Sequence, residues 1–538
     1  YYGFSKNYVF FEADTTLVRD SALLEISIRN HTRGSQPADS TRHRRYRIGK
    51  VRIKYPEDMK VRESLLKRLN RITPGALYDE QDINTTYSRF SGVRLFGSVN
   101  INLTETEGDR VDCDISLTQS KIQGMKLNME ASTNSSGLFG VSPSLSYYNK
   151  NIFRGGEWFT LGFMGNFQFK FNDPIRSTEL GISAGISFPE FLFLPDSLFG
   201  GTVPRSDLNL SYNYQSRPEY TRNIISTSFG YSWNTGEKFY YTLTPVQLNI
   251  IRLFNLDPEF YADLSNNPYL QSAYQNHFDL GLGGSVYYTT DNSMNPKRSY
   301  FYSRLQVDLA GNFLSLFNPL MPTDAAGNRM IWNTPYSQFA RAELSIVKTW
   351  VFGDKGNHSI ALRGTGGIGY SYGNSDAMPF EKQFYAGGAS SLRGWQSRAI
   401  GPGMSPMNEN FVIPNQTGDI KLEANLEYRF RVFWKIAGAL FVDAGNVWNL
   451  RSSYEGDPGV LRKDTFFQSI ALNWGLGLRL DLDFVLLRLD MGIRLHDPSL
   501  MNQGTDEDPL YRRVGWISPS RWFGKNTFAI HFGVGYPF

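Results

Sequence analysis

The residues that could carry out chemistry are few, and their spacing does not build a catalytic site. Gly364, Gly366 and Gly369 fit the G-x-G-x-x-G pattern that cradles dinucleotide phosphates. That pattern needs a helix directly after it, whereas here it lies in an alternating run, so we predict a strand in which glycine relieves inner crowding. The six histidines, including His496 and His531, lack the spacing of metal ligands, and no G-x-S-x-G nucleophile elbow occurs. We therefore predict that the protein is not an enzyme and has no metal or cofactor.

Cys113 is the only cysteine, so the chain cannot form an internal disulfide. It lies on the apolar side of the alternating run 111–117, where a buried and unreactive thiol is expected. The chain opens on YYGF, without an initiator methionine or a signal peptide. This beginning predicts a processed or trimmed portion of a longer precursor.

The end of the chain indicates which elements position the polar groups. Every second residue is large and apolar, while those between are small or polar; the apolar series is Phe528, Ile530, Phe532, Val534, Tyr536 and Phe538. Successive side chains of a strand point to opposite faces, so this strand has one fully apolar face. Six large apolar residues in a row at alternate positions are typical of a membrane strand with lipid outside and water inside.

The same alternation continues from about residue 122 to the end, and about 16 strands can be counted. We predict a membrane all-β fold, an approximately 16-stranded transmembrane antiparallel β-barrel. Because charges are costly in lipid, the apolar series should face outward and the charged series should face the lumen. The outward residues include Leu476, Leu478 and Leu489, and the inward residues include Arg479, Asp490 and Arg494. Residues 256–277 break the alternation and are predicted to be an extracellular loop with a short helix.

The composition agrees with such a barrel. The mean hydropathy is −0.36, and no segment approaches the ~20 apolar residues of a transmembrane helix. Aromatic residues make up 15% of the 538 residues, and 50 are glycine, as girdles of aromatic residues and closely approaching strands require. The formal charge of +4 is small for this length and implies no general attraction to nucleic acid.

The chain before the barrel has a different pattern. Residues 1–45 are predicted to be a strand pair, 8–13 and 23–28, followed by a polar linker. Residues 46–121 predict a strand, a helix over 57–69, a second helix that Asp79 caps, and two strands over 95–103 and 111–117. This order indicates a small α+β domain.

A long loop between two barrel strands, about residues 372–416, contains the sequence FYAGGASSLRGW from Phe384 to Trp395. It resembles the loop 6 signature of the BamA/TamA superfamily of outer-membrane assembly proteins, F-x-x-G-G-x-x-x-[VIL]-R-G-[FYW]. The matching positions are Gly387, Gly388, Leu392, Arg393, Gly394 and Trp395. Trp395 stands where Phe or Tyr is commoner in the family.

This resemblance implies that the loop folds back into the lumen and that Arg393 pairs with carboxylates on nearby strands. The positions that match the family's strand carboxylates are Glu427 and Asp443. A guanidinium can hydrogen-bond two carboxylates at once through its fixed fork of donors. The resemblance also implies that residues 46–121 are a POTRA domain, that residues 1–45 end a truncated POTRA-like domain, and that 290–296 form a family turn.

The resemblance further implies an assembly factor in the bacterial outer membrane, with its POTRA domain in the periplasm. Nascent barrel proteins would insert through a lateral gate between the first and last strands. On the first strand the gate residues are Met125, Leu127 and Met129, and on the last strand they are Phe532, Val534, Tyr536 and Phe538. Gly533, Gly535 and Pro537 weaken pairing on the last strand, since proline donates no hydrogen bond.

The partners implied are outer-membrane lipids and lipopolysaccharide, nascent outer-membrane proteins, and periplasmic or lipoprotein subunits that bind the POTRA domain, with no nucleic acid. A two-partner-secretion transporter that passes one dedicated polypeptide through the pore is the alternative function. A diffusion porin is disfavoured by the loop signature and by the α+β domain. The sequence does not separate a central BamA-like role from an accessory TamA-like role.

Overall fold

The computed structural model describes residues 9–18, 21–28, 45–133, 139–170, 173–195, 204–236, 238–258, 274–291, 298–353, 356–406, 416–452, 454–482, 486–502, 515–524, 527–534 and 536. The chain divides into two compact units. The first comprises residues 1–124 with the segments 148–159 and 186–205. The second comprises residues 125–147, 160–185 and 206–538. Each unit is considered separately below.

The first unit begins with an antiparallel hairpin of β1 (Val9–Val18) and β2 (Ser21–Ile28). The linker expected over 31–45 lies almost wholly outside the described residues. An α+β fold follows, with the elements β3 (Arg47–Lys54), α1 (Glu63–Leu69), α2 (Glu80–Gly92), β4 (Phe96–Thr106) and β5 (Arg110–Gln119). In its sheet, β5 lies between β3, which is parallel to it, and β4, which is antiparallel.

One helix of this unit begins later than the sequence predicted, and the other begins where it was predicted. α1 begins at Glu63 and not at residue 57, because the chain after Pro56 first makes a turn in which the Met59 amide bonds the Pro56 carbonyl. α2 begins directly after Asp79, whose carboxylate accepts a 2.8 Å hydrogen bond from the Gln81 amide. Their apolar faces pack with β5 around Phe90 and Cys113, both fully buried.

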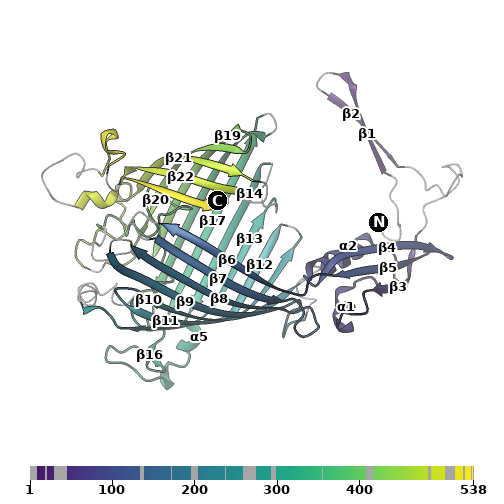
Figure 1. Ribbon diagram of the computed structural model, residues 1–538, viewed down its shortest axis with the longest axis horizontal. Helices are drawn as coiled ribbons and strands as arrows, with labels where there is room; N and C mark the ends of the chain where they lie inside the picture. The colour runs from purple at the N-terminus through teal and green to yellow at the C-terminus, as the bar shows by residue number, and fades with distance from the viewer. Residues whose placement is uncertain are drawn as a thin grey trace. The chain divides into compact units, whose positions relative to one another are not determined.

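The second unit is built on a single sheet of 16 strands, in which successive strands are neighbours (Figure 1). The predicted number of strands is therefore confirmed. The strands are β6 (Gln123–Thr133), β7 (Phe139–Asn149), β8 (Trp158–Lys170), β9 (Asp173–Phe188), β10 (Arg205–Ser216), β11 (Thr221–Thr235), β12 (Phe239–Phe254), β13 (His277–Thr289), β14 (Tyr300–Ala310), β17 (Phe339–Phe352), β18 (His358–Ser371), β19 (Ile420–Phe433), β20 (Ile436–Trp448), β21 (Ala471–Asp481), β22 (Leu486–His496) and β23 (Phe528–Val534). The sheet curves around an interior, and β6 and β23 are its two end strands.

From β14 to β23, the connections at the two ends of the strands differ in length. The links 353–357, 434–435 and 482–485 are short, whereas 311–338, 372–419, 449–470 and 497–527, at the opposite end, are long. The long links carry short elements: α5 (Asn312–Ser315), η3 (Asn318–Leu320), β15 (Met330–Ile331), β16 (Thr334–Pro335), η5 (Pro498–Asn502) and η6 (Pro519–Arg521). The short helix expected within 256–277 falls mainly on residues outside the described part. None of the described helices is long and apolar enough to cross a membrane.

The alternation along the strands gives the sheet one apolar and one polar face. Leu478 is 57% exposed and Leu489 is also exposed, while their neighbours Arg479 and Asp490 are buried in the interior. Ile493 is an exception on the outer series, since it is buried beside its cross-strand partners Trp474 and Phe528.

The last strand also departs from the expected alternation. Ile530 and Phe532 are exposed on the outer face. β23 ends at Val534, and Tyr536 does not continue the outward series. Its ring lies 4.2 Å from the guanidinium of Arg429, an interior residue of β19. The alternation therefore misplaced Tyr536, because strand geometry sets side-chain direction only while the strand continues. The side chains of Met129, Val534 and Phe538 lie outside the described residues.

Candidate functional site

The long link between β18 and β19 enters the interior of the curved sheet and places Arg393 there with no solvent exposure. Its guanidinium binds Asp443 of β20 in a two-point arrangement, with Nε 3.0 Å and Nη2 2.8 Å from the two carboxylate oxygens. Nη1 donates to Glu427 of β19 at 2.5 Å. The guanidinium also lies 3.5 Å from the centre of the Phe441 ring. One side chain thus joins the loop to two adjacent strands.

Asp443 is the most fully bonded carboxylate of this cluster. It accepts the backbone N–H of Arg393 at 3.1 Å in addition to the two guanidinium bonds. The side-chain amides of Asn425 and Asn473 each donate to it at 2.9 Å. Because a buried charge is tolerated only when paired and hydrogen-bonded, Asp443 depends on Arg393 as its cation.

Glu427 belongs to an alternating series of charges that runs along the inner face. Besides Arg393, it accepts Arg429 at 2.8 Å and Arg479 of β21 at 3.2 Å. Arg479 also donates to Asp490 of β22 at 2.5 Å. The ionic cluster therefore spans four neighbouring strands, β19 to β22.

A second ion pair holds the loop beside the first cluster. Arg363 of β18 pairs with Glu423 of β19 at 2.6 Å and donates to the Ser390 carbonyl of the loop at 2.5 Å. The Ser391 hydroxyl donates to the same Glu423 carboxylate. Lys421 lies 3.4 Å from that carboxylate. The loop is thus bonded to β18 and β19 just before Arg393, in addition to its bonds through Arg393 itself.

Two glycines of the motif are required by geometry. Gly387 has a φ of +93°, and a Cβ there would lie 2.0 Å from the Gln396 carbonyl. A Cβ on Gly394 would lie 2.8 Å from Cβ of Asn473, so a side chain would push the loop away from β21. Gly388 also has a positive φ, +101°.

The apolar residues of the motif form a small core within the loop. Leu392 and Trp395 are buried with Phe384, Ile400 and Val447. The Trp395 indole N–H donates to Asp497 at 3.2 Å, on the link after β22. This core keeps water from the ionic cluster, which strengthens its electrostatic interactions.

The last strand touches the Arg393 cluster directly. Nε2 of His531 in β23 lies 3.1 Å from the backbone oxygen of Arg393, where its N–H can donate. Gly492 of β22 lies beside the same carbonyl, and a Cβ there would come within 2.1 Å of that oxygen. At the opposite end of the sheet, Met125 and Leu127 of β6 are each 74% exposed.

The G-x-G-x-x-G segment lies within β18, with no helix after it. Gly367 and Gly369 face inward against Phe384 and Met378, so inner crowding explains those two. Gly364 and Gly366 instead face outward, and a Cβ on Gly364 would meet open space. Inner crowding therefore does not explain them.

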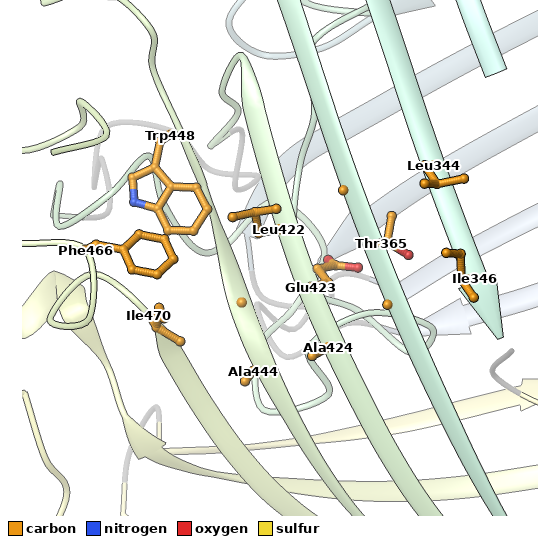
Figure 2. A pocket seen from close by; sticks show the side chains of 13 residues that line it. Leu344, Ile346, Thr365, Leu422, Glu423, Ala424, Ala444, Trp448, Phe466 and Ile470 are labelled. Carbon is orange, nitrogen blue, oxygen red and sulfur yellow. The ribbon is translucent and has the colours of Figure 1, made fainter. Parts of the chain in front are cut away.

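The outward glycines form part of a shallow apolar hollow of about 410 Å³. Gly364, Ala424 and Ala444 lie directly opposite one another on three adjacent strands and form its floor. Figure 2 shows Trp448 and Phe466 on one side of this hollow and Leu344 and Ile346 on the other. The residues that line the hollow are mostly apolar and include no lysine or arginine to bind a phosphate.

Several residues of the site were not singled out from the sequence: the charged Arg363, Glu423 and Arg429, and the polar Ser391. Glu423 precedes Glu427 by four residues on the same strand face, so the alternation could have identified it. The pairing of Arg363 with Glu423 depends on strand order and register. Among the described residues, no three His, Cys, Asp or Glu side chains are placed to hold a metal ion.

A comparison with known protein families fits this architecture. The Omp85 superfamily domain matches residues 121–538, which include all 16 strands and the Arg393 loop. The chain belongs to the Omp85 superfamily. The resemblance to BamA and its relatives, first noted in the loop motif, is therefore confirmed.

Individual relatives support this assignment. The outer membrane protein assembly factor BamA of Neisseria meningitidis serogroup B is 23% identical over 421 residues. The match covers 72% of this chain and 45% of the relative, so the chain spans less than half the length of that protein.

Two solved structures share the fold. BamA from Haemophilus ducreyi lacking POTRA domains 1–3 has a TM-score of 0.61 at 15% identity, covering 99% of this chain and 90% of that one. CdiB from Acinetobacter baumannii has a TM-score of 0.52 at 13% identity, covering 99% of this chain and 78% of that one.

Proposed function

We propose that this protein is an outer-membrane assembly factor that helps nascent β-barrel proteins fold and insert through a gate between β6 and β23. The observation that carries the proposal is the combination of a firmly anchored Arg393 loop with a sheet whose two end strands are β6 and β23. The likeness to the Neisseria assembly factor supports it.

The physical reason for a gate is the cost of unpaired backbone groups in lipid. A strand cannot enter the hydrocarbon region until its N–H and C=O groups are paired. The edge of β6 or β23 offers such groups, and an incoming strand can add to it as a new strand.

The last strand is well suited to release its partner. β23 has seven residues, whereas β6 has eleven, so few backbone bonds can form between them. Its neighbour β22 pairs with it from Leu487↔Val534 to Ile493↔Phe528. The His531–Arg393 contact holds β23 against the loop, so that opening would occur on its β6 side.

The remaining assignments are part of the same proposal. Residues 122–538 form a closed barrel in the bacterial outer membrane, in contact with lipids and lipopolysaccharide. Residues 46–121 are a POTRA domain in the periplasm, which binds periplasmic or lipoprotein partner subunits, and residues 1–45 end a preceding one. Leu392, Arg393, Gly394 and Trp395 hold the loop, and Glu427 and Asp443 are the lumen partners of Arg393.

A disulfide across the gate tests this function. One variant has cysteines in place of Leu127 in β6 and Phe532 in β23, with Cys113→Ser to remove the native thiol. Its matched control has cysteines in place of Phe532 and Leu489, which lie directly opposite each other on β23 and β22. Both crosslinks hold β23, but only the first closes the gate.

The readout is the insertion of a urea-denatured eight-stranded barrel protein into liposomes that contain the crosslinked protein. We expect the gate crosslink to abolish insertion until a reductant is added, and the control crosslink to leave insertion intact. Normal insertion with the gate crosslinked would overturn the gate. It would favour the two-partner-secretion alternative, in which a dedicated polypeptide passes through the lumen.

A further inference from the structure

The long link between β14 and β17, residues 311–338, folds back onto the strands and will be called the flange. It consists of α5, η3 and the small hairpin of β15 and β16. Two of its side chains, Leu314 and Tyr336, are buried against Phe278 of β13. The flange is thus packed against the sheet and is not a free loop.

The face that the flange covers is the outer one. Along β13, Phe278 and Leu280 fall on the same side as Leu282, which is exposed, whereas His277 and Asp279 are buried on the opposite side. Phe278 and Leu280 both contact the flange. The flange therefore lies over the apolar outer surface, at the long-loop end of the strands.

Hydrogen bonds fix the conformation of the flange. The Tyr336 hydroxyl donates to Asn318 at 2.8 Å. The Asn374 side-chain amide donates to the carbonyls of Arg329 and Tyr336, both at 2.9 Å. Its oxygen accepts the Arg329 amide at 2.6 Å. The outward side chains of the flange are therefore held in place by a bonded scaffold.

That scaffold presents a cluster of large apolar side chains outward. Leu316 is 74% exposed, Leu320 83% and Trp332 70%, and Phe313 and Phe317 are exposed beside them. The Phe313 and Phe317 rings contact edge to face at 5.3 Å. Exposed apolar clusters of this kind mark a surface that binds a partner or a membrane.

The turn of the flange is polar. At its turn the Asp324 carboxylate accepts hydrogen bonds from the Ala326 and Asn328 amides, at 2.9 and 2.8 Å. Burial raises the pKa of the Asp324 carboxyl, but the hydrogen bonds from Asn328 and Ala326 together outweigh it and hold this pKa below its ordinary value. The turn of the flange is therefore suited to water and its exposed apolar cluster to hydrocarbon, the combination found in interfacial membrane segments.

We propose that the flange is a membrane-interface element that inserts Phe313, Leu316, Phe317, Leu320 and Trp332 among the acyl chains of the lipid leaflet at the long-loop end. The occupant is lipid because the cluster continues the outer surface on which the apolar residues Leu282, Leu305 and Val307 are exposed. The inference rests on the proposed membrane location of the barrel and not on the gate.

Trp332 makes the proposal measurable. The intact protein is reconstituted in phosphatidylcholine bilayers with and without brominated acyl chains, and the Trp332 emission is obtained as wild type minus Trp332→Phe. Trp350, an exposed outer residue of β17, supplies a reference by the same subtraction. We expect both components to lose most of their intensity in brominated bilayers and little with aqueous iodide.

Different results would overturn the flange proposal and the membrane location of the barrel. If Trp350 is quenched by the brominated chains while Trp332 is quenched only by iodide, the flange lies in water and the proposal is wrong. If neither component responds to bromine, the membrane location of the barrel is wrong. In a Leu316→Asp/Leu320→Asp variant, we expect Trp332 to be quenched by iodide and no longer by bromine, while the quenching of Trp350 stays unchanged. Both leucines are exposed, so replacing them leaves the packed side of the flange intact. An unchanged Trp332 in that variant also contradicts the proposal.

Discussion

Replacing Arg393 by alanine removes the cation at the centre of the interior cluster. Glu427 keeps two arginines, Arg429 and Arg479, at 2.8 and 3.2 Å. Asp443 keeps only the neutral amides of Asn425 and Asn473 among its described side-chain partners. The loss therefore falls mainly on Asp443, which has no solvent exposure.

The size of this effect follows from leaving one buried carboxylate without its cation. Breaking a buried ion pair in this way costs roughly 3–5 kcal/mol. We expect Arg393→Ala to lower the temperature at which the folded band disappears on seminative gels. The control is Arg431→Ala, an exposed arginine at the short-turn end. Surface changes of that kind stay within about 0.5 kcal/mol.

A second variant isolates the charge. In Arg393→Ala/Asp443→Asn the uncompensated carboxylate becomes a neutral amide of the same shape, so the double variant should be more stable than Arg393→Ala alone. A double variant that is no more stable than the single one would refute the reasoning. So would an Arg393→Ala protein as heat-resistant as the Arg431→Ala control.

Further predictions concern packing, the thiol and a helix cap. Gly394→Ala should destabilise the fold by about 1–3 kcal/mol through overpacking against Asn473, whereas Gly364→Ala, whose Cβ meets open space, should not; equal unfolding temperatures would contradict this. Burial, and secondarily the Asp114 charge, raises the pKa of the Cys113 thiol to about 11. Maleimide should therefore label Cys113 at pH 8 only after denaturation, and stability should fall as the pH rises from 9 towards 11, because only the unfolded thiol ionises there; rapid native labelling would refute this. Asp79→Ala should cost about 1 kcal/mol and speed hydrogen exchange at the start of α2, and unchanged exchange would show that the cap contributes nothing.

The alternation of the strands predicted much of the fold because strand geometry fixes which face a residue occupies. Leu478 and Leu489 lie outside and Arg479 and Asp490 inside for that reason alone. Tyr536 follows the same alternation in sequence, but its strand ends two residues earlier, and the ring lies over Arg429. The end of a strand depends on its partner, which the sequence of one strand does not contain.

The partners of Arg393 could be named from the loop motif, but the wider cluster could not. The pairing of Arg479 with Glu427 joins residues 52 positions apart through strand order. The flange is a second example, since Leu314 and Leu316 are both apolar in sequence. Only the packing on Phe278 distinguishes the buried Leu314 from the exposed Leu316.

The most direct test of the gate is to trap a barrel client during insertion. A stalled eight-stranded client with one cysteine in its terminal strand is mixed with variants that have single cysteines along β6, at Met125 or Leu127, all in the Cys113→Ser background. A control variant has its cysteine in place of Tyr302, on the inner face of β14. We predict disulfides with β6. When the client cysteine is moved by two residues, the β6 position that it crosslinks should also change by two residues, as strand pairing requires. Crosslinks to residue 302 in place of β6 would contradict the gate and indicate passage through the lumen.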